Sequence, residues 1–332
     1  MRGEIRVGTA GWNYPSGRGT WNGVFYPAPR PRGFDELAYY AEHFDFVEIN
    51  STFYRMPDAP MVRRWVERTP SGFLFAAKLF QKFTHPDMYL AQAGSSDWDL
   101  SAGDCDQFRL GIEPLATAAR LAAVLIQFPP SFHATPETRA YLDWLLRAFR
   151  DYPLAVELRH KSWSDEAADT RARLHEANAA WVLIDEPKFA SSIEQGVEAW
   201  RRGALETRSS SGLPATPPPL QASKPVDRPL TYLRLHGRNR AQWWDHAEAE
   251  DRYNYLYSKD ELAPFAETAK AEADEGQRVI VAFNNHFSAK AVANAAILKY
   301  QIGQIVPGEY PRGMVERYPE LGGIARTGIS LL

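Results

Sequence analysis

Acidic, basic and imidazole side chains follow most of the short apolar runs of this 332-residue chain, and these residue types suit acid–base chemistry. Glu48 and Glu157 are the candidates for general acid and base, and His236 and Asp185 are further candidates for proton transfer. Nearby lysine and arginine side chains suit an anionic group such as a phosphate. The pattern favours an enzyme that acts on a phosphate-bearing or other anionic ligand, with hydrolysis as one candidate reaction.

The residues that we expect to contact the ligand combine cations, orienting amides and aromatic rings. They are Trp12, Tyr14, Asn50, Tyr54, Lys78, His85, Gln127, Arg159, His160, Arg234, Arg238, Asn284 and Asn285. Aromatic rings in loops can stack on bases or sugars. A non-catalytic protein that binds a nucleotide or a single-stranded nucleic acid would carry the same residues, so this alternative stays open.

These residues meet in one place only if the chain alternates between strands and helices. Apolar, β-branched runs predict eight strands, at Ile5–Thr9, Phe46–Asn50, Phe73–Ala77, Ala123–Gln127, Leu154–Leu158, Trp181–Asp185, Tyr232–Leu235 and Val279–Phe283. Helical periodicity between them predicts helices at Phe34–His43, Ala59–Arg68, Glu113–Leu121, Pro136–Phe149, Ala168–Ala177, Lys259–Gly276 and Ala289–Ile302. This alternation indicates a single (β/α)8, TIM-barrel-like α/β domain over residues 1–332.

Local signals agree with this fold class. Ser258 and Glu261 form a capping-box pattern, and Thr135 precedes a proline at the first position of a predicted helix. The alternative is an open doubly wound sheet, which needs a glycine-rich turn that opens a helix after the first strand. Here the residues after the first strand run into Pro15 instead, which favours the barrel.

Alternation along each strand predicts which side chains face the barrel interior, because the helix-facing side is normally apolar. The polar residues expected to face inward are Glu48, Asn50, Glu157, Arg159, Arg234 and His236. Asp185 joins them only if Val182 and Ile184 pack on helices. Because the carboxyl ends of barrel strands share one face, these groups predict a site at that face.

Three other interpretations fit the same residues. Glu48, Glu157 and Asp185 can form a purely structural ionic plug with Lys78, Arg159 and Arg234. The same three acids with His236 can instead hold a divalent metal for phosphodiester hydrolysis, although the arginines compete for the carboxylates. Finally, Glu48 and Glu157 can form the carboxylate pair of a glycosidase-like hydrolase. No other cofactor is predicted.

Composition narrows the function class. A formal charge of −3 argues against a general polycation for nucleic acid or membranes, although a local basic site remains compatible with it. The longest apolar runs have six residues, and no export signal opens the chain. The single cysteine, Cys105, excludes an internal disulfide and a cysteine-based zinc site. We expect a cytoplasmic protein, with no prediction of its oligomeric state.

Residues 203–229 interrupt the alternation between the sixth and seventh predicted strands. This stretch is rich in serine, proline and threonine and poor in large apolar residues, which predicts a flexible insertion. Its position after a strand places it on the face of the expected site. Both a lid over the site and a passive surface loop are compatible with this position.

Eight ordered motifs resemble those of one family: VGTAGWNYP, VFYP, FVEINSTFYR, FLFAAKLFQKFTH, LIQFPPSF, AVELRHKSW, YLRLHGR and VAFNN. They are similar to the YecE-like family, known as domain of unknown function 72. The resemblance implies a TIM-barrel-like fold and no established reaction. The chain departs from the family pattern at Ala10, usually serine, at Ala282, usually aromatic, and at Asn254, which stands where an acid is usual.

Overall fold

Nine parallel strands form one sheet in the computed structural model, which describes residues 3–194 and 229–328. The strand order is β6-β5-β4-β3-β2-β1-β9-β8-β7. The two edge strands, β6 (Ala179–Trp181) and β7 (Leu183–Asp185), are separated along the chain only by Val182. The sheet therefore closes through the segment 179–185. The first part of this segment, β6, pairs with β5, and the second part, β7, pairs with β8. This confirms the barrel, with the predicted sixth strand divided in two.

The remaining strands lie within a few residues of the predicted runs. They are β1 (Glu4–Ala10), β2 (Phe46–Ile49), β3 (Leu74–Lys78), β4 (Leu121–Gln127), β5 (Leu154–Glu157), β8 (Leu230–Leu235) and β9 (Arg278–Phe283). Every pair in the sheet is parallel, so the carboxyl ends of the strands meet at one face of the barrel.

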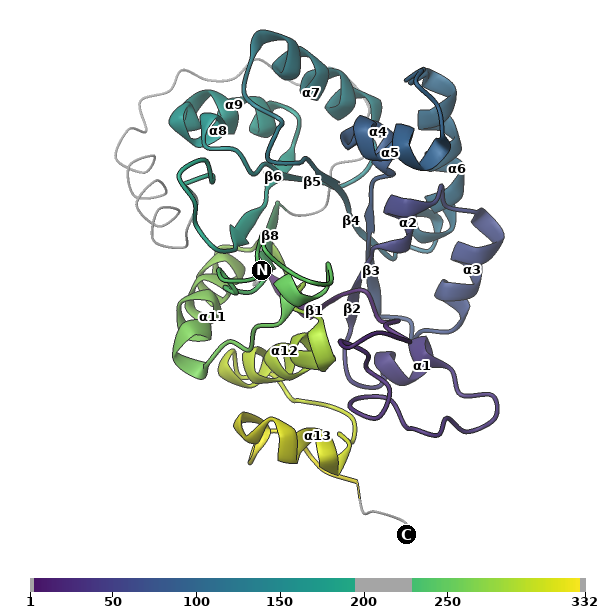
Figure 1. Ribbon diagram of the computed structural model, residues 1–332, viewed down its shortest axis with the longest axis vertical. Helices are drawn as coiled ribbons and strands as arrows, with labels where there is room; N and C mark the ends of the chain where they lie inside the picture. The colour runs from purple at the N-terminus through teal and green to yellow at the C-terminus, as the bar shows by residue number, and fades with distance from the viewer. Residues whose placement is uncertain (1–2, 195–228, 329–332) are drawn as a thin grey trace.

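Helices form an outer ring around these strands (Figure 1). They are α1 (Glu36–Ala41), α2 (Ser51–Tyr54), α3 (Ala59–Glu67), α4 (Gln81–Thr84), α5 (Pro86–Ala93), α6 (Ala102–Thr117), α7 (Pro136–Ala148), α8 (Ser162–Asp165), α9 (Ala167–Glu176), α11 (Lys259–Asp274), α12 (Lys290–Gln301) and α13 (Arg312–Arg317). Short 3-10 turns cover Asp251–Tyr253, Phe287–Ala289 and Pro319–Leu321. Among the described residues, no helix is long and apolar enough to cross a membrane.

The capping boxes at Thr135 and Ser258 are confirmed. The predicted helix at residues 113–121 is displaced, because α6 begins much earlier and ends at Thr117. Ser101 and Asp104 form a third capping box that fixes this start. Leu121, placed at the end of that helix by periodicity, is instead the first residue of β4. The predicted insertion at 203–229 lies outside the described residues except for Pro229.

Small inward-facing residues make room for charged side chains inside the barrel. In a parallel pair, residues in register point to the same face of the sheet. Glu48 is in register with Ala10 and Ala76, and Arg234 is in register with Ala282. The bulky ionic groups on β2 and β8 therefore lie beside alanines. Two departures from the family pattern, Ala10 and Ala282, belong to this row.

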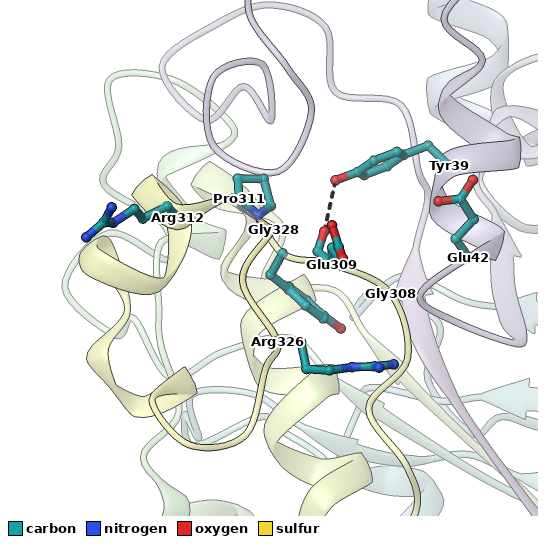
Figure 2. Close-up of a pocket in the computed structure, with 9 residues that line it drawn as sticks. Tyr39, Glu42, Gly308, Glu309, Pro311, Arg312, Arg326 and Gly328 are labelled. Atoms are coloured by element: carbon teal, nitrogen blue, oxygen red, sulfur yellow. Dashed lines mark hydrogen bonds between the residues drawn. The ribbon is translucent and has the colours of Figure 1, made fainter. Parts of the chain in front are cut away.

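A hollow lies away from the carboxyl ends of the strands, where the C-terminal segment packs against α1 (Figure 2). It has a volume of about 590 Å³ and is lined by Tyr39, Glu42, residues 308–312, Arg326 and Gly328. The Tyr39 hydroxyl donates to the carbonyl oxygen of Glu309 at 3.4 Å. His43 bridges the same two residues, since its ring nitrogens lie 2.9 and 3.1 Å from the carbonyl oxygens of Tyr39 and Glu309. This hollow therefore lies at the interface between α1 and the segment 308–328.

Candidate functional site at the barrel mouth

A cavity of about 830 Å³ lies at the carboxyl ends of the strands. Many of the predicted ligand-contacting residues line it: Trp12, Tyr14, Asn50, Tyr54, Lys78, His85, Gln127, Arg159, Arg234 and Asn284. They come from β3, β4 and β8, from α2, and from the segments that follow β1, β2, β5, β9 and α4, which explains why residues so far apart in sequence meet here. The structure thus brings these ten residues together around one cavity.

Arg234 is the centre of the charged groups beneath this cavity. Its Nε lies 2.9 Å from Oε2 of Glu48, and its Nη2 lies 2.6 Å from Oε1 of the same carboxylate. The hydroxyl of Tyr232 also donates to Glu48 Oε2, at 2.9 Å. A bidentate pair of this kind fixes both partners in one orientation. Both carboxylate oxygens of Glu48 are therefore engaged by β8.

Glu157 is held in the same way from two sides. Its Oε2 accepts from Arg234 Nη1 at 2.8 Å, and its Oε1 accepts from Arg159 Nε at 2.7 Å. Burial by itself would raise the pKa of Glu157, but the charges of Arg234 and Arg159 outweigh it and hold the pKa well below its usual range. Glu157 is therefore an ionised, fully buried acceptor.

His236 completes this group. Its Nε2 lies 3.2 Å from Arg159 Nη2 and 3.4 Å from Glu157 Oε1, and Nδ1 lies 2.9 Å from the side-chain nitrogen of Asn284. Burial lowers the pKa of His236 to about 3; the arginine charges contribute to this shift, and the Glu157 charge opposes it. We call Glu48, Glu157, Arg159, Arg234 and His236 the floor cluster. Of its five members, only the two arginines line the cavity.

Lys78 has different surroundings. It lies at the end of β3, two residues beyond Ala76 and on the same inward face, and its Nζ is 3.9 Å from the centre of the Phe53 ring. Within residues 3–194 and 229–328, no carboxylate forms an ion pair with it. Burial, reinforced by the charge of Arg234, lowers the pKa of Lys78 to about 7. A large share of this amine is therefore neutral near pH 7.

The two histidines that line the cavity are also neutral. Burial lowers the pKa of His85 to about 3, and the charges of Lys78 and Arg159 add to this shift. Burial lowers the pKa of His286 to about 4. Nδ1 of His286 faces the carbonyl oxygen of Asn284 at 3.1 Å, so this nitrogen carries the proton and Nε2 is an acceptor.

Several predicted site residues lie elsewhere. Asp185 is in register with Leu235, on the face opposite to Arg234, and it pairs with Arg238 at 2.8 and 2.9 Å. The ring of His160 stacks on that of His133, with centres 3.7 Å apart. The side-chain nitrogen of Asn285 donates to the carbonyl of Tyr255 and to Asn294 Oδ1 of α12, both at 2.8 Å. None of the four predicted site residues Asp185, Arg238, His160 and Asn285 lines the cavity.

Sequence reasoning did not assign Glu250, Arg252 or His286 to the site, although they line the cavity. His286 directly follows the Asn284-Asn285 pair, and Arg252 precedes the Tyr253-Asn254-Tyr255 motif, so both lay next to residues already singled out. Glu250 accepts from the backbone nitrogen of Gly19 at 3.1 Å, a contact between distant loops that no sequence pattern announces.

The charge of the lining is unequal. Lys78, Arg159, Arg234 and Arg252 line the cavity, whereas Glu250 is the one carboxylate on the part of its wall that the structure describes. Asn50 Oδ1, also on the wall, is buried and accepts no hydrogen bond from the described residues. The described residues contain no group of three histidine, cysteine or acidic side chains that could hold a metal ion.

Comparison with known proteins gives a consistent family match. The model of the family described as "Protein of unknown function DUF72" matches residues 6–313. The UPF0759 protein YunF of Bacillus subtilis is 28% identical over 296 residues, which are 87% of this chain and 92% of YunF. The UPF0759 protein YecE of Escherichia coli is 26% identical over 190 residues, which are 54% of this chain and 59% of YecE.

Solved structures agree in fold. A DUF72 family protein from Thermotoga maritima has a TM-score of 0.66 and 29% identity, over 90% of this chain and 99% of that chain. A DUF72 family protein from Enterococcus faecalis has a TM-score of 0.67 and 24% identity, over 90% of this chain and 95% of that chain. The names of these relatives state no reaction.

Proposed function

The chain belongs to the DUF72 family of proteins of unknown function, and we propose that its barrel mouth binds a phosphate-bearing or other anionic small molecule. The single observation that carries this proposal is the excess of basic side chains on the cavity wall, four against Glu250; Arg234 is neutralised by the acids of the floor cluster, whereas Lys78 and Arg252 have no carboxylate partner among the described residues. A guanidinium in a dry, preorganised site stabilises an anion more strongly than the same group does in water.

Arg159 is suited to this role by its unused hydrogen-bonding capacity. Its Nε and Nη2 are engaged within the floor cluster, whereas Nη1 lies 3.7 Å from Glu186 Oε2, too far for a hydrogen bond. Arg252, in the turn at Asp251–Tyr253 after β8, contacts Nε2 of His246 at 2.9 Å and has no carboxylate partner among the described residues. An anion between these two side chains would gain charge-assisted hydrogen bonds from both.

Glu48, Glu157 and His236 act on the ligand through the arginines in this proposal. They are positioning residues, because their polar atoms are engaged within the barrel and none of them lines the cavity. Acid–base chemistry then falls to groups that face the ligand, such as the amine of Lys78. The carboxylate oxygens that a metal ion or a glycosidase mechanism would use already accept from guanidinium groups, which weighs against those two alternatives.

Two exposed aromatic rings favour a ligand with a planar ring. Tyr54 and Trp244 line the cavity and are 58% and 61% exposed. An exposed ring at the rim of a basic cavity is typical of a stacking platform for a nucleobase, worth about 1 to 3 kcal/mol per base. A nucleotide or a short single-stranded nucleic acid is therefore the second candidate ligand.

Thermal unfolding in the presence of ligands tests the proposal. The probes are inorganic phosphate, sugar phosphates, nucleoside monophosphates, a short single-stranded oligonucleotide and neutral sugars, each with and without a chelator. A ligand at 100 times its dissociation constant stabilises the protein by about 2.7 kcal/mol. We expect stabilisation by the phosphate-bearing probes alone. Stabilisation by neutral sugars alone would contradict the anion site, and loss of stability in chelator would restore the metal alternative.

Matched variants localise the binding. Arg252→Ala removes a cation from the cavity wall, whereas Arg312→Ala removes an exposed arginine of α13 that pairs with Glu316. We expect about tenfold weaker phosphate binding for Arg252→Ala, the loss of one charge-assisted hydrogen bond, and no change for Arg312→Ala. For the stacking role, Trp244→Ala should weaken oligonucleotide binding but not phosphate binding. Tyr300→Ala, on α12, is its exposed aromatic control.

A further inference from the structure

We infer that Lys78 is a nucleophile that forms a reversible imine with a carbonyl compound carrying an anionic group, such as an aldehyde or ketone phosphate. The inference rests on the proposed function, because the anionic group would be held by the arginines of the same cavity. It adds a covalent step and a substrate class to that function.

The backbone of Lys78 is held on both sides, so its side chain starts from a fixed point. The hydroxyl of Thr52 donates to the carbonyl oxygen of Lys78 at 2.7 Å, and the backbone nitrogen of Leu79 donates to the carbonyl oxygen of Leu125 at 2.9 Å. Lys78 is also in register with Leu125 of β4. The amine therefore reaches the cavity from a rigid strand end, which is the placement that a covalent nucleophile needs.

A nearby lysine shows how an ordinary buried amine is accommodated. Lys82, on α4, exposes as little of its surface to solvent as Lys78, but its Nζ lies 2.9 Å from Asp104 Oδ1 and 3.2 Å from Asp99 Oδ1. These acids raise the pKa of Lys82 although burial opposes them. Lys82 is therefore a charged, paired amine with no lone pair to offer.

Lys78 has the opposite environment. The two carboxylates whose charges act on it, Glu48 and Glu157, are engaged by Arg234 and Arg159. The face of the Phe53 ring lies against its Nζ. Burial and the neighbouring guanidinium charge lower its pKa to about 7, so the nucleophilic form exists at neutral pH. A desolvated lysine next to other cations is a recognised form of activated amine.

The step balances without an oxidant or a reductant. The lone pair of neutral Nζ attacks the carbonyl carbon, a C–N bond forms while the C–O π bond breaks, and the oxygen takes one of the two protons of Nζ to give a carbinolamine. The carbinolamine loses its hydroxyl group with a proton as water, which leaves a C=N bond to Nζ. When this imine is protonated, its positive charge lies next to the Phe53 ring, an arrangement that stabilises a cation.

Reductive trapping tests the inference. The full-length protein is incubated with glycolaldehyde phosphate and sodium cyanoborohydride, and the modified peptides are identified by mass spectrometry. We expect Lys78 to be labelled at least ten times faster than Lys82, and excess inorganic phosphate to slow the labelling. Lys78→Arg and Lys78→Met, each checked for folding by circular dichroism, should lose this modification while the slow labelling of other lysines is unchanged.

The outcomes separate the two proposals. If glycolaldehyde phosphate stabilises the protein but leaves Lys78 unlabelled, the anion site stands and the imine is wrong. If unphosphorylated glycolaldehyde labels Lys78 equally fast and phosphate gives no protection, the nucleophile stands and the anion site is wrong. Labelling of Lys78 at the same rate as Lys82 would also overturn the inference, because it would show an ordinary amine.

Discussion

Arg234 and Lys78 are both buried basic side chains at the mouth of the same barrel, but their partners differ. Arg234 donates to Glu48, Glu157 and Gln127, so its charge is neutralised inside the floor cluster. Lys78 lies against the Phe53 ring and has no ion-pair partner among the described residues. Burying a charge costs several kcal/mol unless it is paired. The floor cluster therefore holds the site together, whereas Lys78 should lower stability and is available to a ligand.

The largest expected change in the free energy of unfolding comes from removing Arg234, the paired cation. Arg234→Met leaves Glu48 and Glu157 buried without their shared cation, which should lower the free energy of unfolding by about 3–5 kcal/mol. Urea unfolding at pH 7 measures the loss. A loss below about 1 kcal/mol would mean that water or the remaining groups compensate, and that the floor cluster is not the framework of the site.

Lys78→Met should raise the free energy of unfolding, which is the opposite of the effect expected for Arg234→Met. The pKa of Lys78 is about 7 when folded and near 10.5 when unfolded, so the unfolded chain binds more protons between these values. The contribution of Lys78 to the free energy of unfolding of the wild type therefore rises between pH 7 and pH 10.5, because the cost of burying Lys78 disappears as the amine of the unfolded chain loses its proton. We expect Lys78→Met to be more stable by about 1–3 kcal/mol at pH 6, with the difference shrinking towards pH 10. Urea unfolding across this range measures it, and a pH-independent difference would contradict it.

Anion binding sharpens the same contrast. Below pH 7 Lys78 is protonated and adds a charge to the cavity, and this charge is lost as the pH rises through about 7. Sulfate does not titrate in this range, so calorimetry with sulfate isolates the effect. We expect sulfate to bind about three- to tenfold more weakly at pH 8 than at pH 6, through loss of one nearby charge. Lys78→Met should remove most of this dependence, and an unchanged slope in the variant would assign it to another group.

The smallest expected effect is at the partly exposed pair of Arg238 and Asp185. Arg238 is 38% exposed, and its bidentate contact with Asp185 is joined by Glu261. Solvent screens such pairs, so Arg238→Met should cost at most about 1 kcal/mol in urea unfolding and leave sulfate binding unchanged. A loss as large as that of Arg234→Met would show that burial does not separate the two arginines.

The sequence predicted the fold well because its strands have strong signals. Apolar runs with alternating polar residues fixed the inward face of β2, β5 and β8, so the members of the floor cluster were identified without the structure. Their pairing was not predictable, since it depends on distances across the barrel. Asp185 shows the limit of alternation: β7 has only three residues, and its register with β8 turns this carboxylate away from Arg234.

Loop residues were harder to predict. Arg252 and Glu250 reach the cavity because the segment after β8 folds back over the strand ends, and no periodic pattern encodes that path. The unusual character of Lys78 was equally hidden, since it depends on which carboxylates the arginines had already engaged. Sequence placed Lys78 at the site, and only the arrangement of its neighbours separates it from Lys82.

The protonation state of Lys78 tests this account most directly. Nuclear magnetic resonance of protein labelled with ¹³C at the lysine side chains follows each ε-carbon through a pH titration. Lys78→Met assigns the resonance by its disappearance. We predict that the Lys78 resonance titrates with a midpoint near pH 7. A midpoint near pH 10 would show that Lys78 is fully charged at pH 7. The proposed difference between Lys78 and Arg234 and the proposed nucleophile would then both be wrong.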